Sequence, residues 1–280
     1  MGRQRSEFSG SVVARLCSRL QTVCLAQINE MSYHRYCDIF QSMTMKEIML
    51  PRTLKAARNE RSWTETEAAE RLGISQSYLA MLERGQRKVT SRLTRKFKSV
   101  YGLRPTVLPT SDEFKPRVPV TAEEFVKEVS ALGYPGFAYL KARVKERNPA
   151  ETLVEALSQT RLESRVVEAL PWLLLTYWDM SLGWLVKEAK LNNLQNRLGF
   201  VESLAEEVSK RSGSWDEERN RALSELRTML EKSRLAREDT FLKPVNTEVE
   251  REWLRENRSD EARHWNLLTN WRPEHLQYDS

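Results

Sequence analysis

The sequence contains little cysteine, glycine or proline: three cysteines, ten glycines and ten prolines in 280 residues. An odd number of cysteines at irregular spacing does not make a regular disulfide framework, which excludes small disulfide-stabilised secreted domains. We therefore expect a reducing, cytoplasmic location. The scarcity of glycine and proline, with frequent Leu, Glu, Arg and Ala, favours an all-α fold. The composition is 40% hydrophobic and 30% charged, which indicates a folded protein and not a disordered chain.

Long hydrophobic runs are also lacking. The longest nearly apolar stretch, Ala169 to Trp178, spans ten residues. A helix that crosses a bilayer needs about 20 apolar residues. We predict no transmembrane helix and no membrane partner.

The sequence lacks the common catalytic and cofactor motifs. H-E-x-x-H, G-x-x-x-x-G-K, G-x-G-x-x-G and G-x-S-x-G do not occur. The three histidines, His34, His264 and His275, are too few and too far apart for a triad or a metal cluster. His34 lies three residues before Cys37, but two ligands do not make a zinc site. We therefore predict no catalytic residues, no metal site, no cofactor and no enzyme activity.

Positive charge is concentrated in one short part of the chain. Residues 51–109 hold thirteen Lys or Arg against five acids, a net charge of +8, although the whole chain carries only +6. Between Arg84 and Arg104 there are eight basic residues and no acid. A solvated helix face explains many charge runs, and binding to a polyanion is the functional alternative.

The same region shows the pattern of two short helices joined by a tight turn. Thr64-x-x-Glu67 is a capping box that begins one helix, and Gly73 is a residue able to end it. Ser75 is a good N-cap for the next helix. This arrangement indicates a helix-turn-helix unit, whose second helix enters the major groove of DNA.

Small polar residues begin the second helix. Ser75, Gln76 and Ser77 would let the backbone approach DNA and reach base edges, and Gln can bond adenine in a bidentate way. The basic run after Gly85 would lie along the phosphates. We predict phosphate binding for Arg87, Lys88 and Arg92 in this run, and for Arg84 directly before Gly85.

Residues 51–109 resemble the Xre/Cro family of phage-repressor-type helix-turn-helix domains. The resemblance is carried by "LKAARNERSWTETEAAERLGISQSYLAMLERGQRKV", with its Gly-Ile-Ser and Leu-x-x-Leu-Glu-x-Gly signatures. It implies a lambda-repressor-like domain of four or five helices. It also implies that Gln76, Ser77 and Met81 face the bases, and that Arg58 and Glu83 form a structural salt bridge.

Two positions depart from the family pattern. Glu65 stands where the family often has a Gln that bonds a phosphate, and a carboxylate there would be repelled by phosphate. Ala68 stands where a larger Leu is common, and Trp63 is the residue that could fill the volume. The first departure would lower the affinity for DNA and leave the fold intact.

We divide the chain into four parts. Residues 1–48 are an N-terminal extension with three open interpretations: a poorly ordered tail, an amphipathic helix that packs on the rest, or a start codon assigned too far upstream. We favour the first and third together. Residues 49–109 are the helix-turn-helix domain, 110–120 a proline-rich linker, and 121–280 a larger all-helical C-terminal domain.

Seven of the eight tryptophans lie in the C-terminal part. The simpler explanation of these tryptophans is that they fill a helical core. The more specific alternative is that some of them line a groove that binds a protein partner.

From these patterns we expect a sequence-specific, DNA-binding transcriptional regulator that binds double-stranded DNA as a homodimer. In it the helix over about 75–83 reads the major groove. One alternative is an antitoxin, which neutralises a toxin partner through its C-terminal domain and regulates its own operon. A second is a DNA-associated enzyme with an unrecognised helical domain. The sequence does not identify the operator, the effector or the protein partner.

Overall fold

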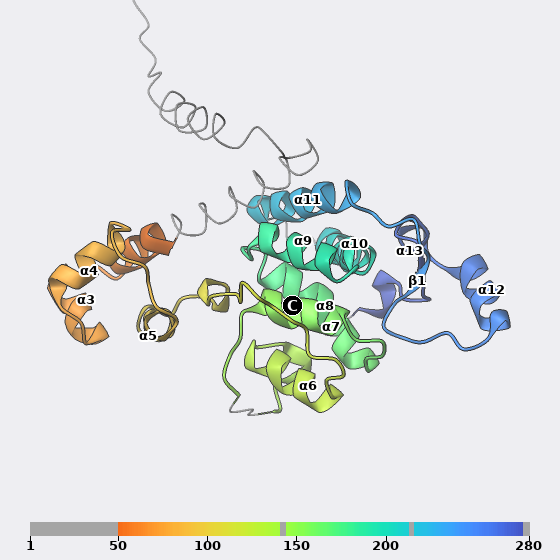
Figure 1. The fold of residues 1–280 in the computed structure, drawn as a ribbon, viewed down its shortest axis with the longest axis horizontal. Coiled ribbons are helices and arrows are strands. Elements are labelled where there is room, and N and C mark those ends of the chain that lie inside the picture. The colour runs from red at the N-terminus through yellow and green to blue at the C-terminus, as the bar shows by residue number, and fades with distance from the viewer. Residues whose placement is uncertain (1–49, 141–143, 213–215, 277–280) are drawn as a thin grey trace, which may run out of the picture. The chain divides into compact units, whose positions relative to one another are not determined.

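The computed structural model describes residues 50–140, 144–212 and 216–276 (Figure 1). These residues are mostly helical, with a helix-turn-helix segment followed by a larger helical part, which confirms the predicted fold class. The predicted extension over 1–48 lies outside the described residues. No helix within the described ranges is long and apolar enough to cross a membrane.

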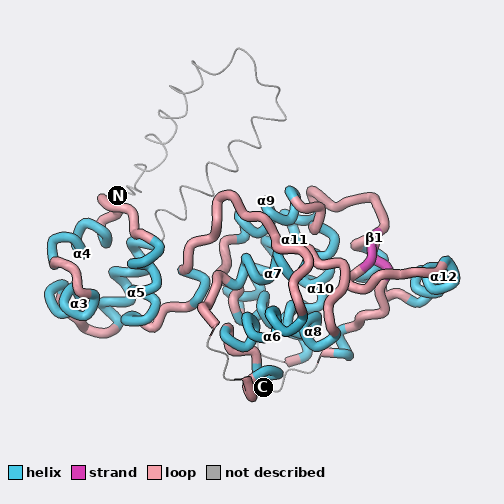
Figure 2. The backbone as a smooth tube through the Cα atoms, turned by 60° about the horizontal axis from the view of Figure 1, so that its bottom comes forward, coloured by secondary structure: helices cyan, strands magenta, loops and turns pink. Residues whose placement is uncertain are grey.

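The helix-turn-helix segment consists of a helix over 50–60 and three further helices. They are α3 (Glu65–Leu72), α4 (Gln76–Glu83) and α5 (Ser91–Tyr101). The labelled helices lie beside one another in both views of the backbone (Figure 1; Figure 2). Their apolar faces meet in a separate core of Leu54, Ala57, Ala68, Ala69, Leu72, Leu79, Leu82, Phe97 and Tyr101.

The remainder of the described chain forms a second helical body. Its α-helices are α6 (Ala122–Ala131), α7 (Pro149–Leu157), α8 (Ser164–Thr176), α9 (Leu182–Leu191), α10 (Gln195–Arg211), α11 (Glu217–Glu231), α12 (Glu248–Asn257) and α13 (Asp260–His264). Short 3-10 helices are η1 (Pro105–Val107), η2 (Pro135–Phe137) and η3 (Pro273–His275). Two strands, β1 (Asp239–Thr240) and β2 (Leu267–Leu268), pair in parallel. These two strands depart from the prediction that residues 121–280 are all helical.

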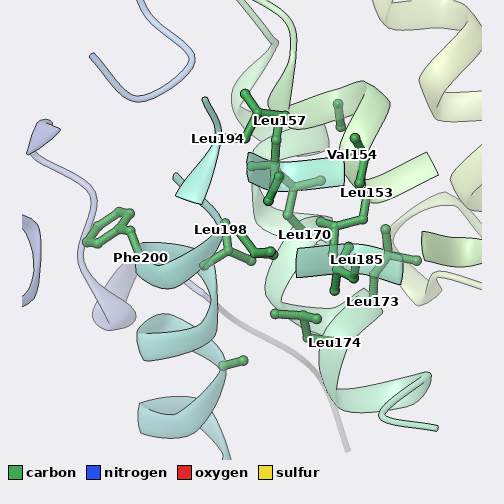
Figure 3. Packing of buried hydrophobic residues seen from close by; sticks show 14 of the residues in the cluster. Leu153, Val154, Leu157, Leu170, Leu173, Leu174, Leu185, Leu194, Leu198 and Phe200 are labelled. Carbon is green, nitrogen blue, oxygen red and sulfur yellow. The ribbon is translucent and has the colours of Figure 1, made fainter. Parts of the chain in front are cut away.

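The core of this body is built around α10. This helix packs against α8, α9, α11 and α13. Leucines from α7, α8 and α9 meet Leu198 in the same cluster (Figure 3). Every residue from Gln195 to Ala205 is buried, so α10 has no solvent face in its first three turns.

Pro171 does not end a helix, although proline inside a helix usually breaks or kinks it. The helix α8 runs on to Thr176 with Pro171 inside it, and the ring is buried. Proline removes one backbone N–H and so one bond within the helix. Pro171 is buried, and the burial of its apolar ring opposes this loss.

The predicted linker is held against the helices that follow it. The Trp184 indole donates to the Ser111 carbonyl at 3.1 Å. Arg117 binds two buried carboxylates, at 2.7 Å from Glu128 and 2.6 Å from Glu155. Arg147 reaches the same Glu155 at 2.5 Å. This segment therefore makes specific contacts, although its two prolines, Pro116 and Pro119, predict only extended backbone.

The tryptophans divide between core and surface. Trp265 and Trp184 are buried, which fits the predicted core role, while Trp253 on α12 is 52% exposed. Trp215 lies outside the described residues.

Candidate nucleic-acid interface

The start of α3 is fixed by its own sequence. The Glu67 N–H donates to Thr64 Oγ1 at 3.2 Å, and the Thr64 N–H donates to Glu67 Oε2 at 2.8 Å. Both halves of the predicted capping box are thus present. These hydrogen bonds from Thr64 lower the pKa of the Glu67 carboxyl, which stays ionised and complements the positive end of α3.

The turn between α3 and α4 depends on Gly73. This residue has φ of 55°, in the left-handed region that glycine adopts at little cost. The geometry lets the Ile74 N–H donate to the Ala69 carbonyl at 3.0 Å, so the end of α3 is satisfied within the turn. A Cβ at Gly73 would lie 2.8 Å from Lys96 Nζ, so an ammonium of α5 stands directly beside the turn.

The first turn of α4 faces solvent. Ser75 caps the helix and accepts the Tyr78 N–H at 3.3 Å. Ser75, Gln76 and Ser77 are exposed, whereas Met81 is only partly exposed. On the opposite face Leu79 and Leu82 are fully buried. The helix therefore presents its predicted base-reading turn outward and is anchored by its inner face.

Gln76 is hydrogen-bonded to Glu65, one of the two residues that depart from the family pattern. Its Nε2 donates to Glu65 Oε2 at 3.5 Å, across the turn from α4 to the first residue of α3. One carboxylate oxygen of Glu65 is thus directed toward α4. The amide of Gln76 keeps its Oε1 and its second N–H for another partner.

The predicted ion pair joins the helix over 50–60 to the end of α4. Arg58 makes a bidentate contact with Glu83, and its NH1 also donates to the Trp63 carbonyl at 3.0 Å. Each of the two charged residues is 8% exposed. The hydrogen bond to Glu83 raises the pKa of Arg58 above its ordinary value, so the guanidinium keeps its charge.

The predicted phosphate-binding residues are all on the surface. Arg84, Arg87, Lys88 and Arg92 are exposed. Arg84 is the C-cap of α4, and Gly85, with φ of 72°, follows it. Lys96 was not among the predicted residues, yet it is exposed and stands at the helix-turn-helix turn. Its place within the run of eight basic residues was the signal that could have identified it.

Comparison with known proteins agrees with this geometry. Residues 54–108 match the family model described as helix-turn-helix, and this segment is of the Xre type. Neither the curated proteins nor the solved structures gave a match to the chain.

Proposed function

We propose, from the helix-turn-helix domain at residues 54–108, that this protein regulates transcription by binding a specific sequence in double-stranded DNA. The observation that supports this most strongly is the exposed polar first turn of α4, with the basic residues of 84–104 beside it. The mechanism is binding and not catalysis. In this proposal the protein acts in the cytoplasm.

In this proposal the exposed residues of α4 and of the segments beside it form two groups, one that reads bases and one that binds phosphates. Ser75, Gln76 and Ser77 read base edges in the major groove, with Met81 making an apolar contact at the side. The cations Arg84, Arg87, Lys88 and Arg92 hold phosphates and set the position of the helix without reading sequence. Lys96, beside the turn, joins this second group.

A homodimer fits the size of the reading helix. One helix of eight residues reaches only a few base pairs, which is too short a sequence to select one site in a genome. Two copies on a near-palindrome would double the reading length, with half-sites about 34 Å apart.

The test is selection of preferred sequences from random duplex DNA by the full chain, followed by titration at several salt concentrations. We expect an enriched near-palindrome and an affinity that falls linearly with salt on logarithmic axes, with a slope of about −0.9 for each phosphate contacted. An affinity that does not change with salt, or no enriched sequence, would contradict the proposal.

An antitoxin is the second candidate, and one feature of α12 favours it. Val249 is 78% exposed and Trp253 52% exposed, one turn apart on the same helix. An exposed tryptophan is the residue type most enriched in binding hot spots. Co-expression with the product of a neighbouring reading frame would test this: a complex lost in Trp253→Ala, with DNA binding retained, supports the antitoxin.

A further inference from the structure

A pocket of about 600 Å³ lies on the second helical body, outside the helix-turn-helix domain. Its volume is within the range of about 300–1,000 Å³ that small-molecule sites occupy. The lining comes from four separate segments, at the start of α6, the start of α8, residues 242–243 and Trp271. The predicted DNA contacts use none of these residues.

The inner wall of the pocket is apolar and firmly held. Val167 is 3% exposed and Leu242 1% exposed, and both belong to the main core cluster. The Leu162 N–H donates to the Leu242 carbonyl at 3.0 Å, which joins the segment before α8 to the segment after β1. Trp271 is partly buried against the same cluster and adds a flat indole to the lining.

Two cations stand on the rim of this apolar wall. Arg161 is exposed, and within the described ranges it has no hydrogen-bonding or ion-pair partner. Lys243 lies 3.3 Å from Glu250, but its side chain is 73% exposed and can turn toward the pocket. Glu163 is the single acid in the lining, so the cations outnumber it.

The N-terminus of α8 lies at the rim of the pocket. It begins at Ser164, and Glu163 at its N-cap makes no side-chain hydrogen bond to the first turn. The first N–H groups of a helix have no partner within it and carry partial positive charge. Glu163 carries a full negative charge at the same position, which offsets this partial charge, so Arg161 and Lys243 supply the positive charge of the rim.

We propose that this pocket binds a small molecule in which an anionic group is joined to a flat ring. The ring lies against Trp271 and the apolar wall, and the anion is held by Arg161 and Lys243. Phosphate on a nucleotide and carboxylate on an aromatic acid share this chemistry. The proposal goes beyond DNA binding and does not depend on it.

The probe for the test is 1-anilinonaphthalene-8-sulfonate, an anion on flat rings whose fluorescence rises on binding. Its neutral counterpart is N-phenyl-1-naphthylamine, which lacks the sulfonate. We expect one sulfonate probe bound per chain. The double variant Arg161→Ala/Lys243→Ala should weaken its binding roughly tenfold or more, because both charge-assisted contacts are lost. The neutral probe should bind both proteins equally.

The matched control is Lys190→Ala/Arg221→Ala, which removes two exposed cations that do not line the pocket. This control should bind the sulfonate probe like the unmodified chain, and circular dichroism should show that all the proteins are folded. Trp271→Leu is a second variant, which keeps both cations. It should weaken the binding of both probes.

Competition separates the two sources of the ligand. Displacement of the probe by adenosine monophosphate assigns the site to nucleotides, and displacement by indole-3-acetate assigns it to aromatic acids. Displacement by neither, or equal binding of the sulfonate probe to both double variants, would overturn the proposal. The titration contains no DNA, so its outcome is separate from that of the DNA-binding test.

Discussion

The Arg58 guanidinium and the Glu83 carboxylate meet in parallel, with Nε to Oε1 and NH2 to Oε2 both at 2.8 Å. The pair connects residues 25 positions apart, from the first helix of the helix-turn-helix domain to the last residue of α4. Because both side chains are largely removed from water, each charge is stabilised mainly by the other. The position of the proposed reading helix is therefore coupled to this contact.

Arg58→Ala should destabilise the domain strongly. The substitution leaves the Glu83 carboxylate buried without its partner, which typically costs about 3–5 kcal/mol. Urea unfolding followed by circular dichroism measures the loss. Lys55→Ala, an exposed cation on the same helix, is the control and should change the free energy of unfolding little. A loss as small as that of the control would mean that the pair does not support the fold.

Gln76→Ala and Arg92→Ala should have different effects on DNA binding. Removal of the Gln76 amide should relax the preference at one base position, at about 1–3 kcal/mol of discrimination. Removal of Arg92 should weaken binding to all DNA sequences alike. It should also reduce the slope of log affinity against log salt concentration by about 1. Binding titrations on the selected site and on single-base variants distinguish these outcomes. Equal effects of both substitutions on every sequence would exclude base reading by Gln76.

Glu65→Gln should tighten DNA binding. The substitution removes a negative charge at the start of α3 but keeps an acceptor for the Gln76 amide. We expect a several-fold gain in affinity at low salt that shrinks as salt rises, because screening weakens the repulsion from phosphate. Glu70→Gln removes an exposed acid elsewhere on α3 and is the control. If both variants gain equally, the effect is one of net charge and not of the position of Glu65.

A buried carboxyl on α10 makes stability depend on pH. Glu202 is 0% exposed, and neither of its oxygens has a hydrogen-bond partner within the described residues. Burial raises its pKa from 4.5 to about 8. The cations Arg227 and Lys210 lower this pKa, and the acids Glu206 and Glu231 raise it further, but burial has the largest effect.

Between pH 4.5 and about 8 the folded state therefore holds a proton on Glu202 that the unfolded state has released. The free energy of unfolding should fall across this window by about 1.4 kcal/mol per pH unit from this group, and then level off. The glutamine of the Glu202→Gln variant stays neutral at every pH. The free energy of unfolding of this variant, relative to that of the unmodified protein, should therefore increase as the pH rises. Urea unfolding from about pH 5 to about pH 9 tests this. A stability difference that does not vary with pH would show that Glu202 is ionised when buried.

The helix-turn-helix part was predictable because its signals are local. Each signal acts on backbone groups only a few residues away. The signals are the capping box of Thr64 and Glu67, the turn residue Gly73 and the N-cap Ser75. Such hydrogen bonds form wherever the sequence carries these residues at this spacing. The first turn of α4 faces solvent because Leu79 and Leu82 hold the opposite face of the helix in the core.

The central helix of the second body was not predictable in the same way. A helix that is buried on all sides has no alternation of polar and apolar faces. Polar residues such as Gln195, Asn196 and Arg197 stand inside the protein at the start of α10. Arg197 is satisfied there by Asp239 at 2.9 Å and by the Leu157 carbonyl at 2.9 Å, partners about 40 residues away.

The sequence by itself thus determined the caps, the turn glycine and the basic surface, since these depend on neighbours along the chain and on charge. Tertiary structure alone decided that Glu202 is buried, that Pro171 continues a helix, and that Arg161, Lys243 and Trp271 line one pocket. Those outcomes depend on segments up to 150 positions apart, such as Ala122 and Trp271, lining the same space. Burial and long-range contact are properties of the packed helices, and no local pattern encodes them.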